Sequence, residues 1–158
     1  MPFKIRRMSR ADRSAIIEML RNTPAFIPEE VETAGELIDC YFEDPSGCGY
    51  HFFVAEHEGK VAGYICYGRT PLTKGTWDVY WLATTAALRG QGIGGSLLKL
   101  AEQDIMDLGG RLILIETSSN PNYEAARKFY CSHSYIEVST IPDFYSPGDN
   151  KVTFWKAL

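Results

Sequence analysis

With 158 residues, the chain has the length of one ordinary domain, which can bury about two-thirds of its unfolded surface. Its composition is globular, with 45% apolar and 23% charged residues, and no apolar run approaches the roughly 20 residues that cross a bilayer. The net charge of −4 argues against broad contact with nucleic-acid phosphates and suits a small or cationic substrate better. We therefore expect a single domain over residues 1–158 with neither a membrane nor a nucleic-acid partner. A cytoplasmic location is expected because the basic N-terminus lacks the apolar core of a signal peptide.

The N-terminal quarter is predicted to form a strand and two helices. A strand over residues 3–8 is followed by Ser9 and Asp12, which have the S-x-x-D form of a capping box and begin a helix that ends near Arg21. Proline residues interrupt the chain before a second helix begins near Glu29. Its apolar residues recur at spacings of three and four along one face, namely Val31, Ala34, Ile38 and Tyr41.

The rest of the chain alternates predicted strands with two further helices. The strands are predicted over residues 50–56, 61–69, 76–84, 111–117, 135–141 and 151–158. The first two flank a short turn that contains glycine, which favours a hairpin. One helix follows a glycine-rich stretch and stops at Gly109 and Gly110, and the other covers residues 122–133. This order predicts an α/β fold in which helices cover the faces of a mixed sheet.

The glycine-rich stretch "LRGQGIGGSLL", residues 88–98, is the most informative segment. Its four glycines remove the Cβ atoms from a whole turn, so that several backbone N–H groups can approach one ligand. The helix that follows adds its unpaired amides and the positive end of its dipole, which favours a phosphate. Arg89 adds a charge and Ser96 a hydroxyl donor.

Three phosphate-binding patterns compete for this stretch. A Walker loop needs a lysine after the glycines, and none is present. The dinucleotide pattern G-x-G-x-x-G is matched by Gly90, Gly92 and Gly95, but the turn lies too far from the preceding strand and too little chain follows for that fold. The third pattern, [RQ]-x-x-G-x-[GA], is matched by Arg89, Gly92 and Gly94 between a strand and a helix.

With this loop after "DVYWLATTAA" and with "EAARKFYCSHSYIEV" one strand later, the chain resembles the GNAT superfamily of N-acetyltransferases over nearly its whole length. The resemblance implies a mostly antiparallel mixed sheet and acetyl-CoA as the cofactor. It implies that the pantetheine pairs with backbone atoms of Leu82, Ala83 and Thr84. It also implies that the diphosphate lies on the amides of the loop, with Ser96 close by; the loop residues are Arg89, Gly90, Gln91, Gly92, Ile93, Gly94 and Gly95.

The same resemblance implies catalytic residues. Tyr130 occupies the position of the tyrosine that protonates the departing CoA sulfur, although it also fits a purely packing role. Glu116 matches the glutamate that ribosomal-protein acetyltransferases use as a base, and we expect partial burial to raise its pKa; a structural acid or a water molecule are the alternatives. Either Asn120 or Asn122 is expected to contact CoA. Ser134 stands where the family commonly has glycine.

The expected acceptor is a primary amine of a small molecule, such as an amino acid or a metabolite. Acceptor contacts are expected from the segment between the first two helices, where Phe26, Glu29, Glu30 and Glu32 combine an apolar wall with acids, and from the aromatic loop before the last strand. Two alternatives stay open: an acetyltransferase of peptide or protein amines, and a non-catalytic acyl-CoA-binding sensor. A homodimer is possible. No metal is expected, because the four cysteines and three histidines lack metal-site spacing.

Overall fold

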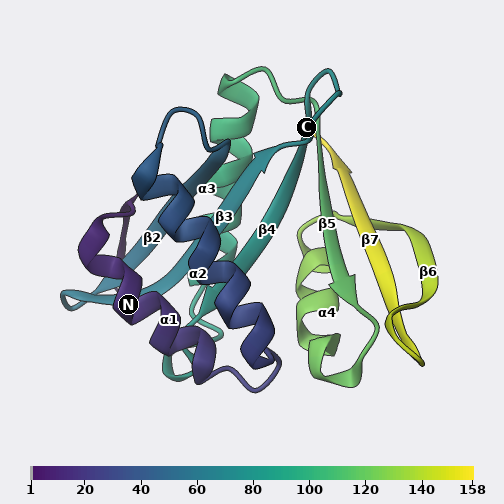
Figure 1. Ribbon diagram of the computed structural model, residues 1–158, viewed down its shortest axis with the longest axis horizontal. Coiled ribbons are helices and arrows are strands. Elements are labelled where there is room, and N and C mark those ends of the chain that lie inside the picture. Colours follow the sequence, from purple (N-terminus) through teal and green to yellow (C-terminus); the bar gives the residue numbers. More distant parts are fainter. Residues whose placement is uncertain (1) are drawn as a thin grey trace.

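A computed structural model describes residues 2–158, which form one seven-stranded sheet with two helices on each face (Figure 1). The strands are β1 (Lys4–Arg7), β2 (Tyr50–His57), β3 (Lys60–Arg69), β4 (Thr76–Thr84), β5 (Leu112–Ser118), β6 (Ile136–Ser146) and β7 (Asp149–Ala157). The helices are α1 (Arg13–Arg21), α2 (Pro28–Glu43), α3 (Ile93–Asp107) and α4 (Glu124–Ser132), with short 3-10 turns η1 (Arg10–Asp12), η2 (Ala86–Leu88) and η3 (Pro121–Tyr123). The predicted α/β fold with a mixed sheet is confirmed, and every predicted strand and helix is present in the predicted order.

Two regions differ most from the sequence prediction. The strand predicted to end at residue 141 continues as β6 to Ser146, and β7 begins at Asp149, so a predicted loop is instead a hairpin with a tight turn at Gly148 (φ +82°). Pro142 suggested a loop, but it is tolerated because β6 is an edge strand and proline lacks only a donor there. The last predicted helix begins later, at Glu124, because Pro121 starts a separate 3-10 turn.

The strand order is β1-β2-β3-β4-β5-β7-β6, and β4 and β5 form the only parallel pair among the described strands. Their ladder extends only from the pair Thr76–Leu112 to the pair Val79–Ile115, after which the two strands diverge. A β-bulge coincides with this point, because the register between β3 and β4 shifts and Tyr80 is left without a partner in β3. Bulges bend a strand and increase its twist, which explains why β4 leaves β5 here.

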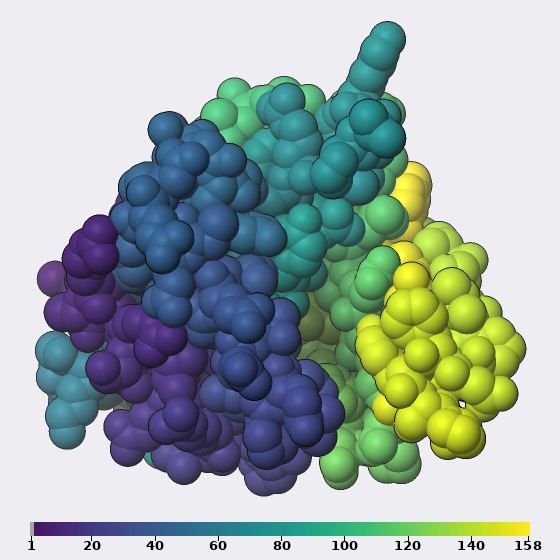
Figure 2. Space-filling model, in the orientation of Figure 1, coloured from purple at the N-terminus to yellow at the C-terminus, as the bar shows by residue number. Residues whose placement is uncertain are grey.

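Two apolar cores lie on opposite faces of the sheet. One face is covered by α3 and α4, whose residues pack with Trp77, Val79, Ile113 and Ile115. The other face is covered by α1 and α2, which lie in front of β2, β3 and β4 in Figure 1. No helix covers that face of β5, β7 and β6 in this view, and Figure 2 shows the surface hollowed between α2 and the yellow C-terminal strands. No helix within residues 2–158 has both the length and the apolar character needed to cross a membrane.

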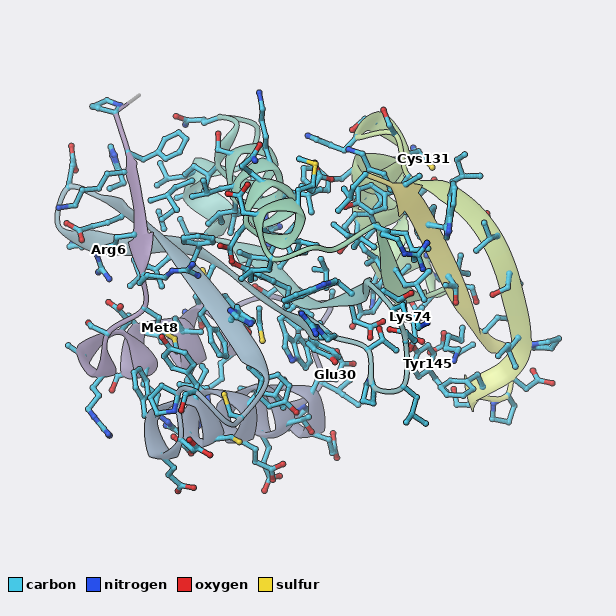
Figure 3. The ribbon with its side chains drawn as sticks, turned by 90° about the horizontal axis from the view of Figure 1, so that it is seen from above. Arg6, Met8, Glu30, Lys74, Cys131 and Tyr145 are labelled. Atoms are coloured by element: carbon cyan, nitrogen blue, oxygen red, sulfur yellow. The ribbon has the colours of Figure 1, made fainter. Side chains whose placement is uncertain are left out.

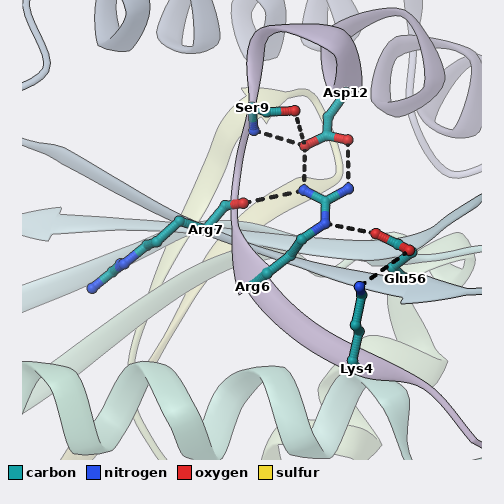
Figure 4. A network of polar contacts seen from close by, with 6 residues as sticks. All are labelled: Lys4, Arg6, Arg7, Ser9, Asp12 and Glu56. Carbon is teal, nitrogen blue, oxygen red and sulfur yellow. Dashed lines mark hydrogen bonds and ion pairs between the residues drawn. The ribbon is translucent and has the colours of Figure 1, made fainter. Parts of the chain in front are cut away.

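A polar network fastens the N-terminal strand to the first helix (Figure 4). The Arg6 guanidinium donates to both carboxylate oxygens of Asp12, at 2.7 and 2.9 Å, and to Glu56 at 2.7 Å. The Ser9 backbone N–H donates to the same carboxylate at 2.7 Å, which confirms the predicted capping box. Hydrogen bonds from Arg6 lower the pKa of Asp12, and this buried carboxylate is therefore held in its charged form.

Candidate active site

The divergence of β4 and β5 leaves two strand edges without a partner strand. Beyond Tyr80, β4 pairs only with β3, through Leu82–Ile65, Ala83–Tyr64 and Thr84–Gly63. Residues 116–118 of β5 pair only with β7. The edge of β4 that faces β5 therefore offers backbone donors and acceptors to an extended ligand, at the residues for which pantetheine contacts were predicted.

A glycine turn follows β4 and begins α3. Gly90 and Gly92 both adopt left-handed backbone conformations, with φ of +80° and +86°, which a residue with a side chain rarely adopts. The first hydrogen bond of α3 runs from the Ser96 N–H to the Gly92 carbonyl, at 3.0 Å. The N–H groups of Ile93, Gly94 and Gly95 precede that bond, so they have no acceptor within the helix. The Ile93 side chain is buried in the core, so only its backbone is available at the turn.

A cavity of about 480 Å³ lies at this turn. Its lining residues come from α3, from the end of α4 and from β7, and they are Gly92, Gly95, Ser96, Lys99, Glu102, His133, Ser134 and Lys156. Three of them carry basic side chains that sequence reasoning missed: Lys99, His133 and Lys156. Lys99 lies three residues after Ser96 on one helix, so helical spacing was a usable signal. His133 and Lys156 come from distant segments and had no local signal.

His133 is held in one orientation beside Gly95. Its Nδ1 lies 2.9 Å from the Phe129 carbonyl, and its ring is 4.3 Å from the Phe129 ring. Because a carbonyl oxygen can only accept a hydrogen bond, Nδ1 carries the proton. Nε2, on the other side of the ring, lies next to Gly95. A Cβ atom added to Gly95 would lie 2.8 Å from that Nε2, a distance that real Cβ contacts do not show. Glycine at position 95 thus keeps the α3 terminus and the imidazole close together.

Tyr130 lies in the core formed with α4, and its side chain is 8% exposed. Its ring packs against Phe154 and Tyr135, with centroids 5.7 and 6.2 Å away. The hydroxyl makes no hydrogen bond to any residue between 2 and 158, and burial raises its pKa to about 12. The phenol is therefore protonated at neutral pH, and its O–H group is free to donate a hydrogen bond. This geometry is compatible with the predicted acid and also with a packing role.

Glu116 differs from its prediction. We expected partial burial, but its side chain is 49% exposed and pairs with Lys151, at 3.5 Å between Oε1 and Nζ. The predicted burial is wrong because alternate residues of β5 face opposite sides of the sheet, and Glu116 faces the side without a helix. A second carboxylate, missed by sequence reasoning, lies on the neighbouring strand: Asp78 is half-buried and accepts a hydrogen bond from the Thr70 hydroxyl. Burial raises the pKa of Asp78, and the charge of Glu116 raises it further.

The two predicted asparagines lie in the turn before α4. The Asn120 side chain accepts from the Asn122 N–H at 3.0 Å, and the Asn120 N–H donates to the Ser118 hydroxyl at 2.9 Å. Arg127 fixes the same turn by donating to the Ser118 and Asn120 carbonyls, at 2.7 and 2.9 Å. Asn120 thus shapes its own turn, whereas the Asn122 side chain makes no hydrogen bond to the described residues and is exposed.

The segment between α1 and α2 lies against the divergent end of β4. The Phe26 ring meets the Trp81 ring edge-on at 5.6 Å and the Tyr123 ring at 6.3 Å. Of the predicted acids, Glu30 is half-buried and accepts a hydrogen bond from the Tyr123 hydroxyl at 2.7 Å, whereas Glu29 and Glu32 are exposed. The structure therefore brings Phe26 and Glu30 to the opening between the two halves of the sheet, and it leaves the other two acids outside.

Ser134 ends α4 in a left-handed conformation, with φ of +71°. This is the conformation that a glycine at this position would adopt without strain. Within residues 2–158, no group of three or more His, Cys, Asp or Glu side chains is placed to hold a metal ion, and the four cysteines are free thiols.

Comparison with known proteins identifies related chains. A family model described as "Acetyltransferase (GNAT) family" matches residues 15–133. An uncharacterised N-acetyltransferase from Methanocaldococcus jannaschii is 30% identical over 106 residues, which cover 66% of this chain and 65% of that protein, slightly under two-thirds of its length. A GNAT-family protein of known structure from Desulfovibrio desulfuricans is 34% identical, with a TM-score of 0.95 and 99% of each chain covered.

A more distant structure has the same fold. This is an N-acetyltransferase from Thermoplasma acidophilum, solved in complex with coenzyme A, which is 18% identical with a TM-score of 0.78 and all of each chain covered. At that identity the likeness extends to the fold alone.

Proposed function

The chain belongs to the GNAT acetyltransferase family, and on that premise we propose that it transfers the acetyl group of acetyl-CoA to a primary amine of a small molecule, such as an amino acid or a metabolite. The observation that carries this proposal is the juxtaposition of an unpaired β4 edge with the glycine turn at the start of α3. The first accepts an extended amide chain and the second accepts a diphosphate. We also propose that the reaction takes place in the cytoplasm.

The residues present fit coenzyme A. The free amides of Ile93, Gly94 and Gly95 point from a helix N-terminus, where negative charge is stabilised. Lys99 and Lys156 add positive charge to the cavity beside them, although Lys156 is already bonded to Glu102 at 3.0 Å. Leu82, Ala83 and Thr84 would hold the pantetheine through backbone atoms. When bound, acetyl-CoA supplies a thioester activated for attack by an amine.

The amine nitrogen must lose two protons, one before it attacks and one afterwards, and the departing sulfur must gain one. An alkyl ammonium ion is unreactive until it loses a proton, because the nitrogen lone pair is otherwise occupied. Glu116 and Asp78 are the carboxylates beside the point where β4 and β5 diverge, and we propose that one of them takes that proton, directly or through water. Tyr130, which is protonated at neutral pH, would donate its phenolic proton to the departing sulfur, and the proton that the nitrogen loses after attack would restore the phenol.

Substitution of Tyr130 by phenylalanine tests the proposal. The change keeps the packed ring and removes only a hydroxyl without a protein partner, so the free energy of unfolding should hold while kcat falls about 100-fold or more. Tyr64→Phe is the matched control, because Tyr64 is also buried with an unpartnered hydroxyl and its side chain packs in the core on the other face of the sheet. Thiol release from acetyl-CoA, measured over a panel of amines, reports the turnover.

Two results would favour the alternatives. Calorimetric binding of coenzyme A without amine-dependent thiol release would favour an acyl-CoA-binding sensor. Turnover of peptide N-termini in preference to free amino acids and amines would favour a peptide or protein acetyltransferase. Full activity of Tyr130→Phe would leave Tyr130 with a packing role only.

A further inference from the structure

Glu30 is a half-buried carboxylate that the transfer reaction proposed above does not use. It lies in the first turn of α2 and accepts a hydrogen bond from Tyr123 at 2.7 Å. Burial raises its pKa, and the Tyr123 hydrogen bond opposes that rise. No Lys, Arg or His among the described residues pairs with it. A carboxylate that is partly removed from water without a cation costs free energy, which a positively charged ligand would recover.

Further carboxylates face the same opening from the other half of the molecule. Burial raises the pKa of Tyr145 in β6, and the charges of Glu116, Asp149 and Glu30 raise it further. Asp149 accepts a hydrogen bond from the Ser118 hydroxyl. Figure 3 shows Glu30 and Tyr145 on facing sides of this opening, one from α2 and one from β6.

Few cations balance these acids. Lys151 pairs with Glu116 and lies 4.4 Å from the centre of the Phe144 ring. The Arg127 guanidinium is directed at backbone carbonyls instead of carboxylates. Glu30 and Asp149 thus face the opening without a basic partner among the described ion pairs.

Aromatic rings connect the reaction point to Glu30. Trp81 directly precedes the β4 residues proposed to hold the pantetheine, and Phe26 packs edge-on against Trp81 and Tyr123. Tyr123 in turn bonds to Glu30. Aromatic rings beside a carboxylate form a favourable environment for an organic ammonium ion, because the ring faces are electron-rich.

The charge state of the acceptor follows from these positions. In the proposed function, Glu116 or Asp78 takes the proton of the reacting nitrogen, which leaves Glu30 to hold a second nitrogen that stays protonated. We propose that the acceptor carries a second ammonium group that stays charged at neutral pH, as an α,ω-diamine does, and that Glu30, oriented by Tyr123, binds this distal ammonium. This inference rests on the proposed acetyltransferase function and names its class of acceptor.

The test compares 1,4-diaminobutane with butylamine and 4-aminobutan-1-ol, which keep the reacting amine and replace the distal ammonium. The wild-type protein should prefer the diamine about tenfold or more in kcat/KM, allowing for its two equivalent nitrogens. Glu30→Gln keeps the shape and an acceptor for Tyr123 but removes the charge. It should raise KM for the diamine about tenfold, leave kcat and the KM for acetyl-CoA unchanged, and abolish the preference. Glu29→Gln, an exposed neighbour without an ion pair, should behave as wild type.

Each outcome decides the inference. It is overturned if wild type shows no preference for the diamine, or if Glu30→Gln retains that preference. It is also overturned if Glu29→Gln loses the preference to the same extent, since the effect would then be general charge. If no amine releases thiol from wild type, the proposed function fails as well, and calorimetry with coenzyme A shows whether the cofactor site stands. Denaturant unfolding of Glu30→Gln establishes that the variant is folded.

Discussion

The contact between Gly95 and His133 makes a sharp prediction about the start of α3. An alanine Cβ at position 95 would lie 2.8 Å from Nε2 of His133, whereas at Gly94 it would lie 3.4 Å from the Phe129 ring, an ordinary contact. Both substitutions gain the same helix propensity, so their difference isolates the steric term. The imidazole cannot easily move away from position 95, because it is hydrogen-bonded to the Phe129 carbonyl and packs on the Phe129 ring.

Overpacking of this kind costs about 1–3 kcal/mol, so Gly95→Ala should be less stable than Gly94→Ala by that amount. Urea unfolding followed by circular dichroism measures the difference. Replacing His133 by alanine removes the obstructing atom, and the penalty of Gly95→Ala should largely vanish in the double variant. Equal midpoints for Gly95→Ala and Gly94→Ala, or an unchanged penalty without the imidazole, would refute the reasoning.

Two further predictions concern stability. Ser134→Gly should stabilise the protein by about 0.5–1 kcal/mol, because the serine has φ of +71° and glycine adopts that conformation without strain; a lower urea midpoint would contradict this. Asp12→Asn should destabilise it by about 1–3 kcal/mol near pH 7, because Arg6 loses one of its two carboxylate partners. Since the folded state lowers the pKa of Asp12 below 3.8, this contribution is complete above that pH and is lost as the pH falls further. The two unfolding curves, measured from pH 7 to pH 2, should therefore converge in acid.

Much of this architecture was predictable from local patterns. The capping pair Ser9 and Asp12 and the glycine turn each concern residues close in the chain, where backbone preferences decide the outcome. The extent of β6 was not predictable in this way, because Pro142 signals a loop, whereas the strand continues through an irregular stretch until Ser146 pairs with Asp149 of β7. The exposure of Glu116 depends on which face of the sheet lacks a helix, which is a property of the whole fold.

The candidate site shows the same division. Arg89 to Ser96 form a continuous motif, so the sequence alone was sufficient to locate the turn. Lys156, His133 and the Glu30–Tyr123 pair reach their positions only through folding, and Glu30 and Tyr123 are 93 residues apart. Their positions follow from the fold and not from any motif.

The short β4–β5 ladder has a thermodynamic consequence. Four residue pairs form the whole β-ladder between the N-terminal and C-terminal parts of the sheet. A molecule that bridges the two free edges would lengthen this seam, so its binding energy would add directly to the cohesion of the two halves. At a concentration 100 times its Kd, such a ligand adds about 2.7 kcal/mol of stability. The melting temperature of this protein is thus expected to rise with the fraction of molecules that have the ligand bound.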